Sequence, residues 1–296
     1  MMFGVHAGLH KTSVEELRGI WQRVEQLGFD FVSVWDHLYS ADLSGPDCLE
    51  AVTTHTALAM STDRVRVGSL VYSVGFRHPA VLAKMIAGID RISGGRAELG
   101  LGAGWHQGEY QAFGIDFPPV ATRLDQLEEA AACIRALLHS PEPVDFEGRW
   151  FRLERAECVP RPVQDHLPIT IGGGGERRTL RIVARFADVW NVPFVPPDEY
   201  ARKVGVLHDH CAAAGREPTD IRCSVNIGLA TSEENLTEQF GAMAPLLRPG
   251  VLMGSDDEMR DAIGRYREAG ADQLNLAIRA PFDLDVIERF AGVALV

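Results

Sequence analysis

The pair Asp36-His37 could transfer a proton to or from a bound molecule. Histidine exchanges a proton near neutral pH, and a carboxylate beside it can orient a ring or bind a ligand donor. Most single histidines have structural roles, but this pair directly follows Phe31-Val32-Ser33-Val34-Trp35, an apolar run typical of a buried strand. Because α/β barrels bind their ligands at strand ends, Asp36-His37 is the first candidate site.

Four consecutive glycines, Gly172 to Gly175, could hold a phosphate group. They lie between the apolar run Ile169-Thr170-Ile171 and a helical pattern that opens Glu176-Arg177-Arg178-Thr179. Without β-carbons, backbone N–H groups can close on an anion, the helix N-terminus adds partial positive charge, and Arg177 or Arg178 could pair with the oxygens. A flexible turn that lets strand and helix pack closely explains the same residues, so both interpretations stay open.

A second glycine loop, Gly102-Ala103-Gly104, also follows an apolar run. Trp105 behind it could form a wall for a planar ligand. The spacing Gly100-x-Gly102-x-Gly104 differs from the G-x-G-x-x-G fingerprint, so we expect no nicotinamide site of the Rossmann type. A tight turn would account for one of these glycines more easily than for two.

His6 and His10 suggest a metal site if they join Asp36-His37. The two histidines straddle Gly8, where the chain is expected to turn, so they need not converge. The H-x-H pattern of metal-dependent barrel hydrolases is absent. The 5 cysteines are scattered, which fits neither a disulfide framework nor a zinc site. We therefore expect no catalytic metal and reduced cysteines.

The elements that position these residues alternate between short apolar runs and amphipathic helical stretches along the chain. Such alternation requires a parallel sheet. We expect strands at residues 3–8, 31–35, 64–71, 96–101, 169–171, 188–191, 221–229 and 272–277. Eight such units predict a (β/α)8 TIM barrel, although an open doubly wound sheet could use most of them.

Residues 140–167 interrupt the alternation after the fourth β/α unit. This stretch is rich in proline and arginine, and residues 144–151 predict a small hairpin that turns at Gly148. We expect an insertion region within a single (β/α)8-barrel domain that spans residues 1–296, a length that α/β barrels can reach as one unit.

Composition limits the partners. Hydrophobic residues make up 46% and charged residues 24% of the chain, values that allow a large buried core. The net charge of -12 disfavours nucleic acid and anionic membranes, because both require a cationic surface. Without a secretory pattern at the N-terminus or a long apolar run, we expect a cytoplasmic protein with a small-molecule substrate.

Several motifs together resemble the luciferase-like monooxygenase superfamily, and in particular its coenzyme F420-dependent oxidoreductases. The resemblance runs in order over nearly the whole chain. It rests on Ser33-Val34-Trp35-Asp36-His37, Val67-Gly68-Ser69-Leu70-Val71 with Phe76-Arg77-His78-Pro79, Arg91-Ile92-Ser93-Gly94-Gly95-Arg96, Gly100 to Trp105 with Glu109, and Ile171 to Gly175.

The resemblance implies a barrel enzyme with a deazaflavin across its strand ends and hydride exchange at the ring. His37 would be the acid/base, and Asp36 would contact the cofactor. Leu70-Val71 would form a non-prolyl cis peptide under the ring, and Ser73 would bind the ring. The residues that would receive the ribityl-phosphate part are Ala103, Gly104, Gly173, Gly174, Gly175 and Arg177.

Two positions depart from the sugar-phosphate dehydrogenases of this group. Ala41 stands where those enzymes have tryptophan, and Trp105 stands where they have glutamate. Sugar-phosphate oxidation is therefore doubtful, and Glu109, one helical turn later, is a second candidate catalytic group.

Three rival functions stay open. They are an FMN-dependent two-component monooxygenase of the same superfamily, a metal-dependent barrel hydrolase and a non-catalytic ligand-binding barrel. The superfamily resemblance also implies a homodimer.

Overall fold

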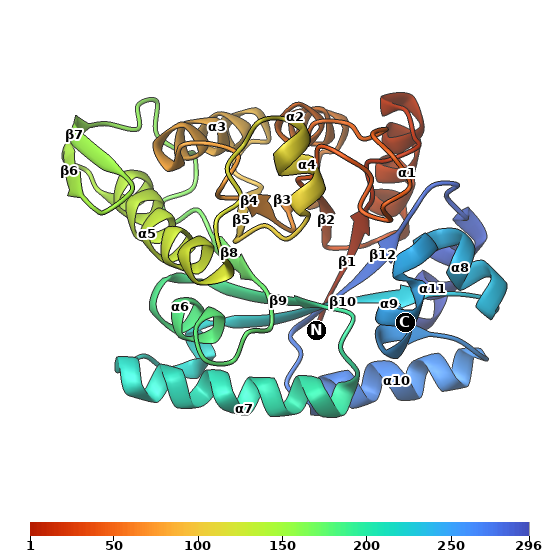
Figure 1. Cartoon of the computed structure of the whole chain (residues 1–296). Helices are drawn as coiled ribbons and strands as arrows, with labels where there is room; N and C mark the ends of the chain where they lie inside the picture. The colour runs from red at the N-terminus through yellow and green to blue at the C-terminus, as the bar shows by residue number, and fades with distance from the viewer. Residues whose placement is uncertain (296) are drawn as a thin grey trace.

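Eight parallel strands close into a barrel in the computed structural model, which describes residues 1–295 (Figure 1). The strands are β1 (Met2–Ala7), β2 (Phe31–Val34), β3 (Arg66–Ser69), β5 (Ala97–Gly102), β8 (Ile169–Gly172), β9 (Val189–Pro193), β10 (Arg222–Leu229) and β12 (Gln273–Ile278). They neighbour one another in the order β12-β1-β2-β3-β5-β8-β9-β10, and β10 pairs with β12. This closure confirms the barrel and removes the open doubly wound sheet as an alternative.

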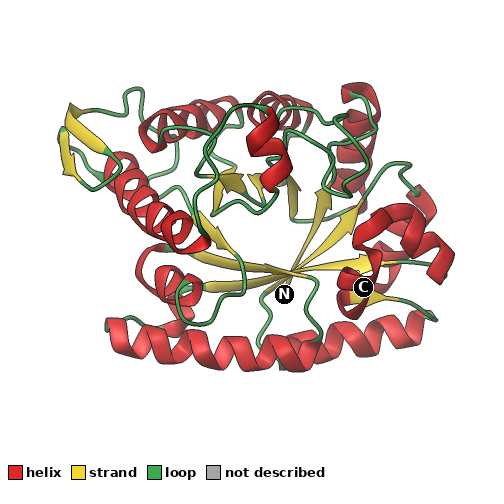
Figure 2. Cartoon of the chain, in the orientation of Figure 1, coloured by secondary structure: helices red, strands yellow, loops and turns green. Residues whose placement is uncertain are grey.

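Helices surround the strands, as Figure 2 shows in red around yellow. They are α1 (Val14–Leu27), α2 (Ala51–Ser61), α3 (Pro79–Ile92), α5 (Val120–His139), α6 (Thr179–Phe186), α7 (Pro197–Ala214), α10 (Asp256–Glu268) and α11 (Leu284–Ala294). Local signals set their ends. Ser13 caps the first turn of α1 by accepting from the Glu16 N–H, and Gly28 ends that helix at φ 99°. No helix within residues 1–295 has the length and apolarity needed to cross a bilayer.

The third strand is shorter than expected. We predicted one strand over residues 64–71, but β3 ends at Ser69. The Leu70-Val71 peptide is cis, and the chain then forms β4 (Tyr72–Ser73), which pairs with β5. The prediction was wrong here because hydrophobic periodicity does not report a change in backbone geometry.

Outside the barrel, β6 (Val144–Glu147) and β7 (Arg152–Ala156) form an antiparallel hairpin with its turn at residues 148–151. This confirms the hairpin expected within residues 140–167. The short helix α4 (Gln107–Ala112) follows β5, and η1 (Pro218–Asp220) precedes β10.

A second excursion was not anticipated. After β10 the chain forms α8 (Glu233–Phe240), η2 (Gly241–Met243), α9 (Ala244–Leu247), η3 (Arg248–Gly250) and β11 (Val251–Leu252), which adds to β10. Figure 1 shows α8 and α9 in light blue beside β10. We call residues 231–253 the seventh-strand insertion.

Candidate active site

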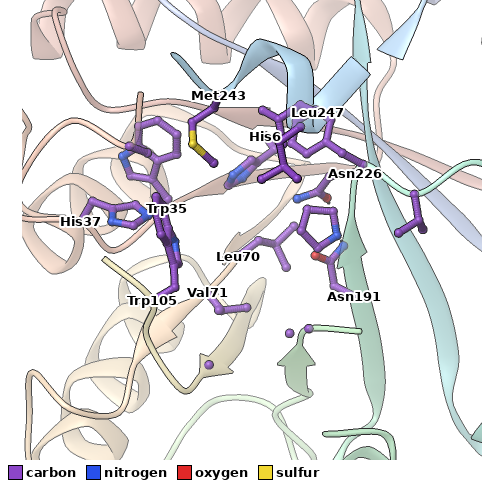
Figure 3. A pocket seen from close by; sticks show the side chains of 18 of the residues that line it. His6, Trp35, His37, Leu70, Val71, Trp105, Asn191, Asn226, Met243 and Leu247 are labelled. Atoms are coloured by element: carbon purple, nitrogen blue, oxygen red, sulfur yellow. Dashed lines mark hydrogen bonds between the residues drawn. The ribbon is translucent and has the colours of Figure 1, made fainter. Parts of the chain in front are cut away.

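A cavity of about 700 Å³ lies where the carboxyl ends of the barrel strands meet (Figure 3). Every barrel strand or the loop that follows it contributes to its wall, from His6 on β1 to Arg279 after β12. The seventh-strand insertion supplies a largely apolar side, formed by Gln239, Phe240, Met243, Leu246, Leu247 and Pro249. This location agrees with the general rule for barrel enzymes and brings most of the predicted residues to one place.

His37 lines the cavity and is held from behind by Glu109. The His37 Nδ1 atom lies 3.0 Å from Glu109 Oε1. The other carboxylate oxygen accepts from the N–H groups of Leu38 (2.8 Å) and Tyr39 (3.2 Å). Glu109 is 1% exposed and does not line the cavity.

The charge state of Glu109 decides which proton His37 carries. Burial alone would raise the pKa of Glu109, but the hydrogen bond and charge of His37 and the two N–H donors hold the pKa below its usual value. An ionised carboxylate can only accept, so Nδ1 of His37 must donate to it. The remaining ring nitrogen, Nε2, is then free to take up or release a proton at the cavity wall.

Asp36 also lines the cavity, but both of its oxygens have protein partners. Arg77 binds them through two nitrogens, at 2.6 and 3.0 Å, and the Ser73 N–H donates to one of them at 2.9 Å. Arg77 also reaches Glu50 at 2.5 Å. Burial raises the pKa of Asp36, while Arg77 and Ser73 act in the opposite direction. Asp36 therefore joins the end of β2 to the loop after β4.

Val71 forms a raised platform in the cavity, and glycines surround it. A β-carbon placed on Gly172 would lie 2.8 Å from Val71 Cγ1, and one on Gly102 would lie 2.5 Å from Val71 Cγ2. Side chains at either position would displace Val71. Close packing against Val71 thus accounts for glycine at these two positions.

Ser73 packs against Gly104 of the second glycine loop. The Ser73 hydroxyl bonds to the Tyr110 hydroxyl and does not line the cavity. Gly104 has φ 74°, and a β-carbon there would lie 2.7 Å from Ser73 Oγ. Gly104 and its neighbour Ala103 do line the cavity, whereas Ser73 lies behind them.

The four-glycine loop reaches the cavity through Gly172 and Gly173. Gly174, Gly175 and Arg177 lie outside its wall, and Arg177 is exposed. The buried cation at this loop is instead Lys203 of α7, whose Nζ donates to the Gly174 carbonyl at 2.9 Å. Sequence reasoning missed Lys203, because nothing in the spacing along α7 relates it to a loop nearly thirty residues earlier.

The residues considered for a metal site have other partners. His6 Nδ1 lies 2.9 Å from Ser33 Oγ, and the His10 ring stacks on Trp35 at 5.2 Å. Burial lowers the pKa of His10 to about 4 and that of His6 well below its ordinary value. Within residues 1–295, no three His, Cys, Asp or Glu side chains form a group that could hold a metal ion.

Several cavity residues were not predicted. Asn191 and Asn226 come from β9 and β10 and are joined by a 3.0 Å hydrogen bond. Arg279 follows β12 and contacts the Trp35 ring. Its position just after the expected strand 272–277 is a sequence signal that marks Arg279 as a candidate site residue.

Comparisons with known proteins agree with this architecture. Residues 1–249 match the family model described as luciferase-like monooxygenase. The F420-dependent glucose-6-phosphate dehydrogenase of Microbacterium testaceum is 30% identical over 251 residues, which cover 83% of this chain and 74% of that protein.

Two solved structures share the fold over nearly the whole chain. An F420-dependent secondary alcohol dehydrogenase, in complex with an F420-acetone adduct, has a TM-score of 0.87 at 20% identity and covers 99% of this chain and 98% of its own. The monooxygenase RslO1 from Streptomyces bottropensis has a TM-score of 0.80 at 25% identity, covering 100% and 99%.

Proposed function

The chain belongs to the luciferase-like monooxygenase family of oxidoreductases, and we propose that it transfers a hydride between coenzyme F420 and a small organic substrate. The observation that carries this proposal is the position of His37. It lines the cavity that also contains the Val71 platform, and its Nδ1 is committed to Glu109. The 30% identical relative named for F420 dependence adds support.

The cavity fits a flat tricyclic cofactor. Val71 packs against Gly102 and Gly172, which have no side chains, so one face of a planar ring would rest on the apolar Val71 side chain. The ring is expected to lie over Leu70 and Val71, and Trp105 would form a wall beside it. Coenzyme F420, when bound, supplies two-electron hydride chemistry.

The phosphate-bearing tail would extend towards Ala103, Gly104 and Gly173, which line the cavity on neighbouring strands β5 and β8. Gly174, Gly175 and Arg177 would contribute where the tail leaves the cavity. The N-cap residue of α6, Arg178, makes no side-chain cap hydrogen bond, and this uncapped N-terminus favours an anion near the loop.

Each polar residue near the ring then has a distinct task. His37 Nε2 takes the proton from a substrate alcohol or returns it to a carbonyl oxygen. Glu109 acts through His37 as a positioning residue, because it lies behind the imidazole. Asp36 lines the cavity and would contact the cofactor edge while Arg77 and the Ser73 N–H hold its carboxylate. Ser73 lies behind the cavity wall with its hydroxyl bonded to Tyr110, so it would support the site without contacting the ring.

The experiment is a pair of titrations of the purified protein, one with oxidised F420 and one with FMN, followed by calorimetry. We expect saturable binding of F420 that is tighter than binding of FMN. Absence of F420 binding below roughly millimolar concentration would overturn the proposal. In the loaded protein, His37→Ala should keep F420 affinity and lower kcat by about 10² to 10⁴.

An FMN-dependent two-component monooxygenase is the second candidate, favoured by the family description and by the likeness to RslO1. Tighter binding of FMN than of F420 in the same titrations would select it. The homodimer, the cytoplasmic location and the single domain spanning residues 1–296 stay predictions.

A further inference from the structure

Arg279 is a buried cation that forms no ion pair with any residue of 1–295. It follows β12, lines the cavity and is 8% exposed. Its Nη1 donates to the backbone carbonyls of Ile278 (2.8 Å) and His6 (3.4 Å). Within residues 1–295, its Nε and Nη2 atoms make no hydrogen bond, and no side-chain carboxylate forms an ion pair with it.

Asp42 is the acidic residue whose charge acts on Arg279, but other groups already bind its carboxylate. Asp42 raises the pKa of Arg279, but its own oxygens bind Lys11 at 3.0 Å and the Ser44 N–H at 2.9 Å. Burial is the larger influence and lowers the pKa of Arg279 to about 9, so the guanidinium is still protonated at neutral pH. A buried charge is costly unless it is paired, which points to a partner that enters the cavity.

Two aromatic rings fix the direction of the guanidinium. Its central carbon lies 4.4 Å from the Trp35 ring and 5.5 Å from the Phe240 ring. These contacts stabilise the cation. A planar, pre-oriented guanidinium suits the two oxygens of a carboxylate.

The place of Arg279 separates it from the glycine loops. In the closed order of strands, β10 and β9 lie between β12 and β8 on one side, and β1, β2 and β3 lie between β12 and β5 on the other. Arg279 therefore lies across the mouth from Gly104 and Gly173. An anion bound there would be distinct from the cofactor phosphate.

Arg279 and His37 share a neighbour. Both contact the Trp35 ring, His37 with its ring centroid at 5.5 Å and Arg279 at 4.4 Å. Both residues also line the same cavity. Phe240, Met243 and Leu247 of the seventh-strand insertion give this cavity an apolar surface, and Figure 3 shows Met243 and Leu247 on that side.

We propose that Arg279 binds the carboxylate of the substrate, so that the enzyme acts on oxo acids or hydroxy acids with an apolar body. This inference rests on the proposed function for the reaction but concerns binding alone. The carboxylate contacts Arg279, the apolar body contacts the seventh-strand insertion, and the reacting oxygen faces His37. The carboxylate undergoes no chemical change.

The test measures binding of two carboxylates, phenylacetate and 4-phenylbutanoate, against their neutral amides. Calorimetry is performed on the protein with and without F420. At least one carboxylate should bind about tenfold or more tightly than its amide, and Arg279→Met should abolish that preference. Arg279→Lys should restore part of it. The matched control is Arg248→Met, which removes an exposed arginine of the seventh-strand insertion and should change nothing.

The outcomes separate this inference from the proposed function. Equal affinity of both carboxylates and their amides for the wild-type protein would overturn it, as would an unchanged preference in Arg279→Met. A large loss of F420 affinity in that variant, with the carboxylate preference intact, would assign Arg279 to the cofactor instead. If F420 does not bind to the wild-type protein but the carboxylates still bind more tightly than their amides, only the proposed function is refuted.

Discussion

The hydrogen bond between His37 and Glu109 joins two elements that are 72 residues apart in sequence. His37 follows β2, whereas Glu109 belongs to α4, a helix of 6 residues after β5. The carboxylate also receives the Leu38 and Tyr39 N–H groups, so it fixes the backbone after β2 as well as the imidazole. One buried charge thus sets both the tautomer and the direction of His37.

We predict that Glu109→Gln lowers kcat by at least about tenfold with little change in KM or F420 affinity. The neutral amide cannot accept from all three donors as the carboxylate does, and it cannot stabilise a protonated imidazole. Steady-state kinetics with a responsive substrate give the split between kcat and KM.

Asp116→Asn is the matched control, because Asp116 is an exposed acid soon after α4 and should leave both constants unchanged. A rise in KM with unchanged kcat would show that Glu109 does not act through His37.

At the scale of elements, the position of Leu70-Val71 depends on the absence of side chains at the ends of β5 and β8. Gly102 and Gly172 end these strands, and a methyl group on either would meet Val71. The cavity floor is thus set by three neighbouring strands acting together. A substitution at the end of β5 or β8 should therefore change the affinity for the cofactor even though it alters no polar contact.

Gly172→Ala should weaken F420 binding by displacing Val71 towards the ring. We expect a loss of about tenfold or more, since overpacking of this kind typically costs about 1 to 3 kcal/mol. Fluorescence titration of F420 measures the effect. Gly88→Ala in α3 is the control, because nothing lies within 4 Å of its added β-carbon. Equal F420 affinity in the wild type and Gly172→Ala would contradict a ring resting on Val71.

Sequence periodicity predicted the eight barrel strands and most helices, because each strand is a short apolar run and each helix has an apolar face. It failed where an element depends on contacts with distant parts of the same chain. β4 has two residues and exists through pairing with β5, and the seventh-strand insertion consists of short turns without a sustained period. Glu109 could be named from the motif, but its contact with His37 required the fold. Arg279 follows the last expected strand, but its contacts with Trp35 and the His6 carbonyl required closure of the barrel.

For the whole molecule, three buried histidines make stability depend on pH. His6, His10 and His55 are each 3% exposed or less, and His55 Nδ1 bonds to the Tyr72 hydroxyl at 2.9 Å. Burial lowers the pKa of His55 to about 4 from 6.5. The unfolded chain therefore takes up this proton first as pH falls, which removes stability between about pH 6.5 and pH 4.

His55→Gln should flatten this dependence. We expect the free energy of unfolding of the wild type to fall more steeply than that of the variant between pH 7.5 and pH 5, by an amount of about 1 to 2 kcal/mol. Urea unfolding at each pH measures it. His208→Gln, at an exposed position on α7, should follow the wild type. Parallel curves for wild type and His55→Gln would refute a neutral buried His55.

The pairing of β1 with β12 has a consequence for synthesis. Residues Met2–Ala7 pair with Gln273–Ile278, so β1 lacks one of its two neighbours until β12 has been synthesised. The His6 carbonyl, which accepts from Arg279 Nη1, likewise lacks this donor until Arg279 has been synthesised. Contacts so distant in sequence form slowly. The cavity wall that includes His6 and Arg279 can therefore form only after β12 has been synthesised and has paired with β1.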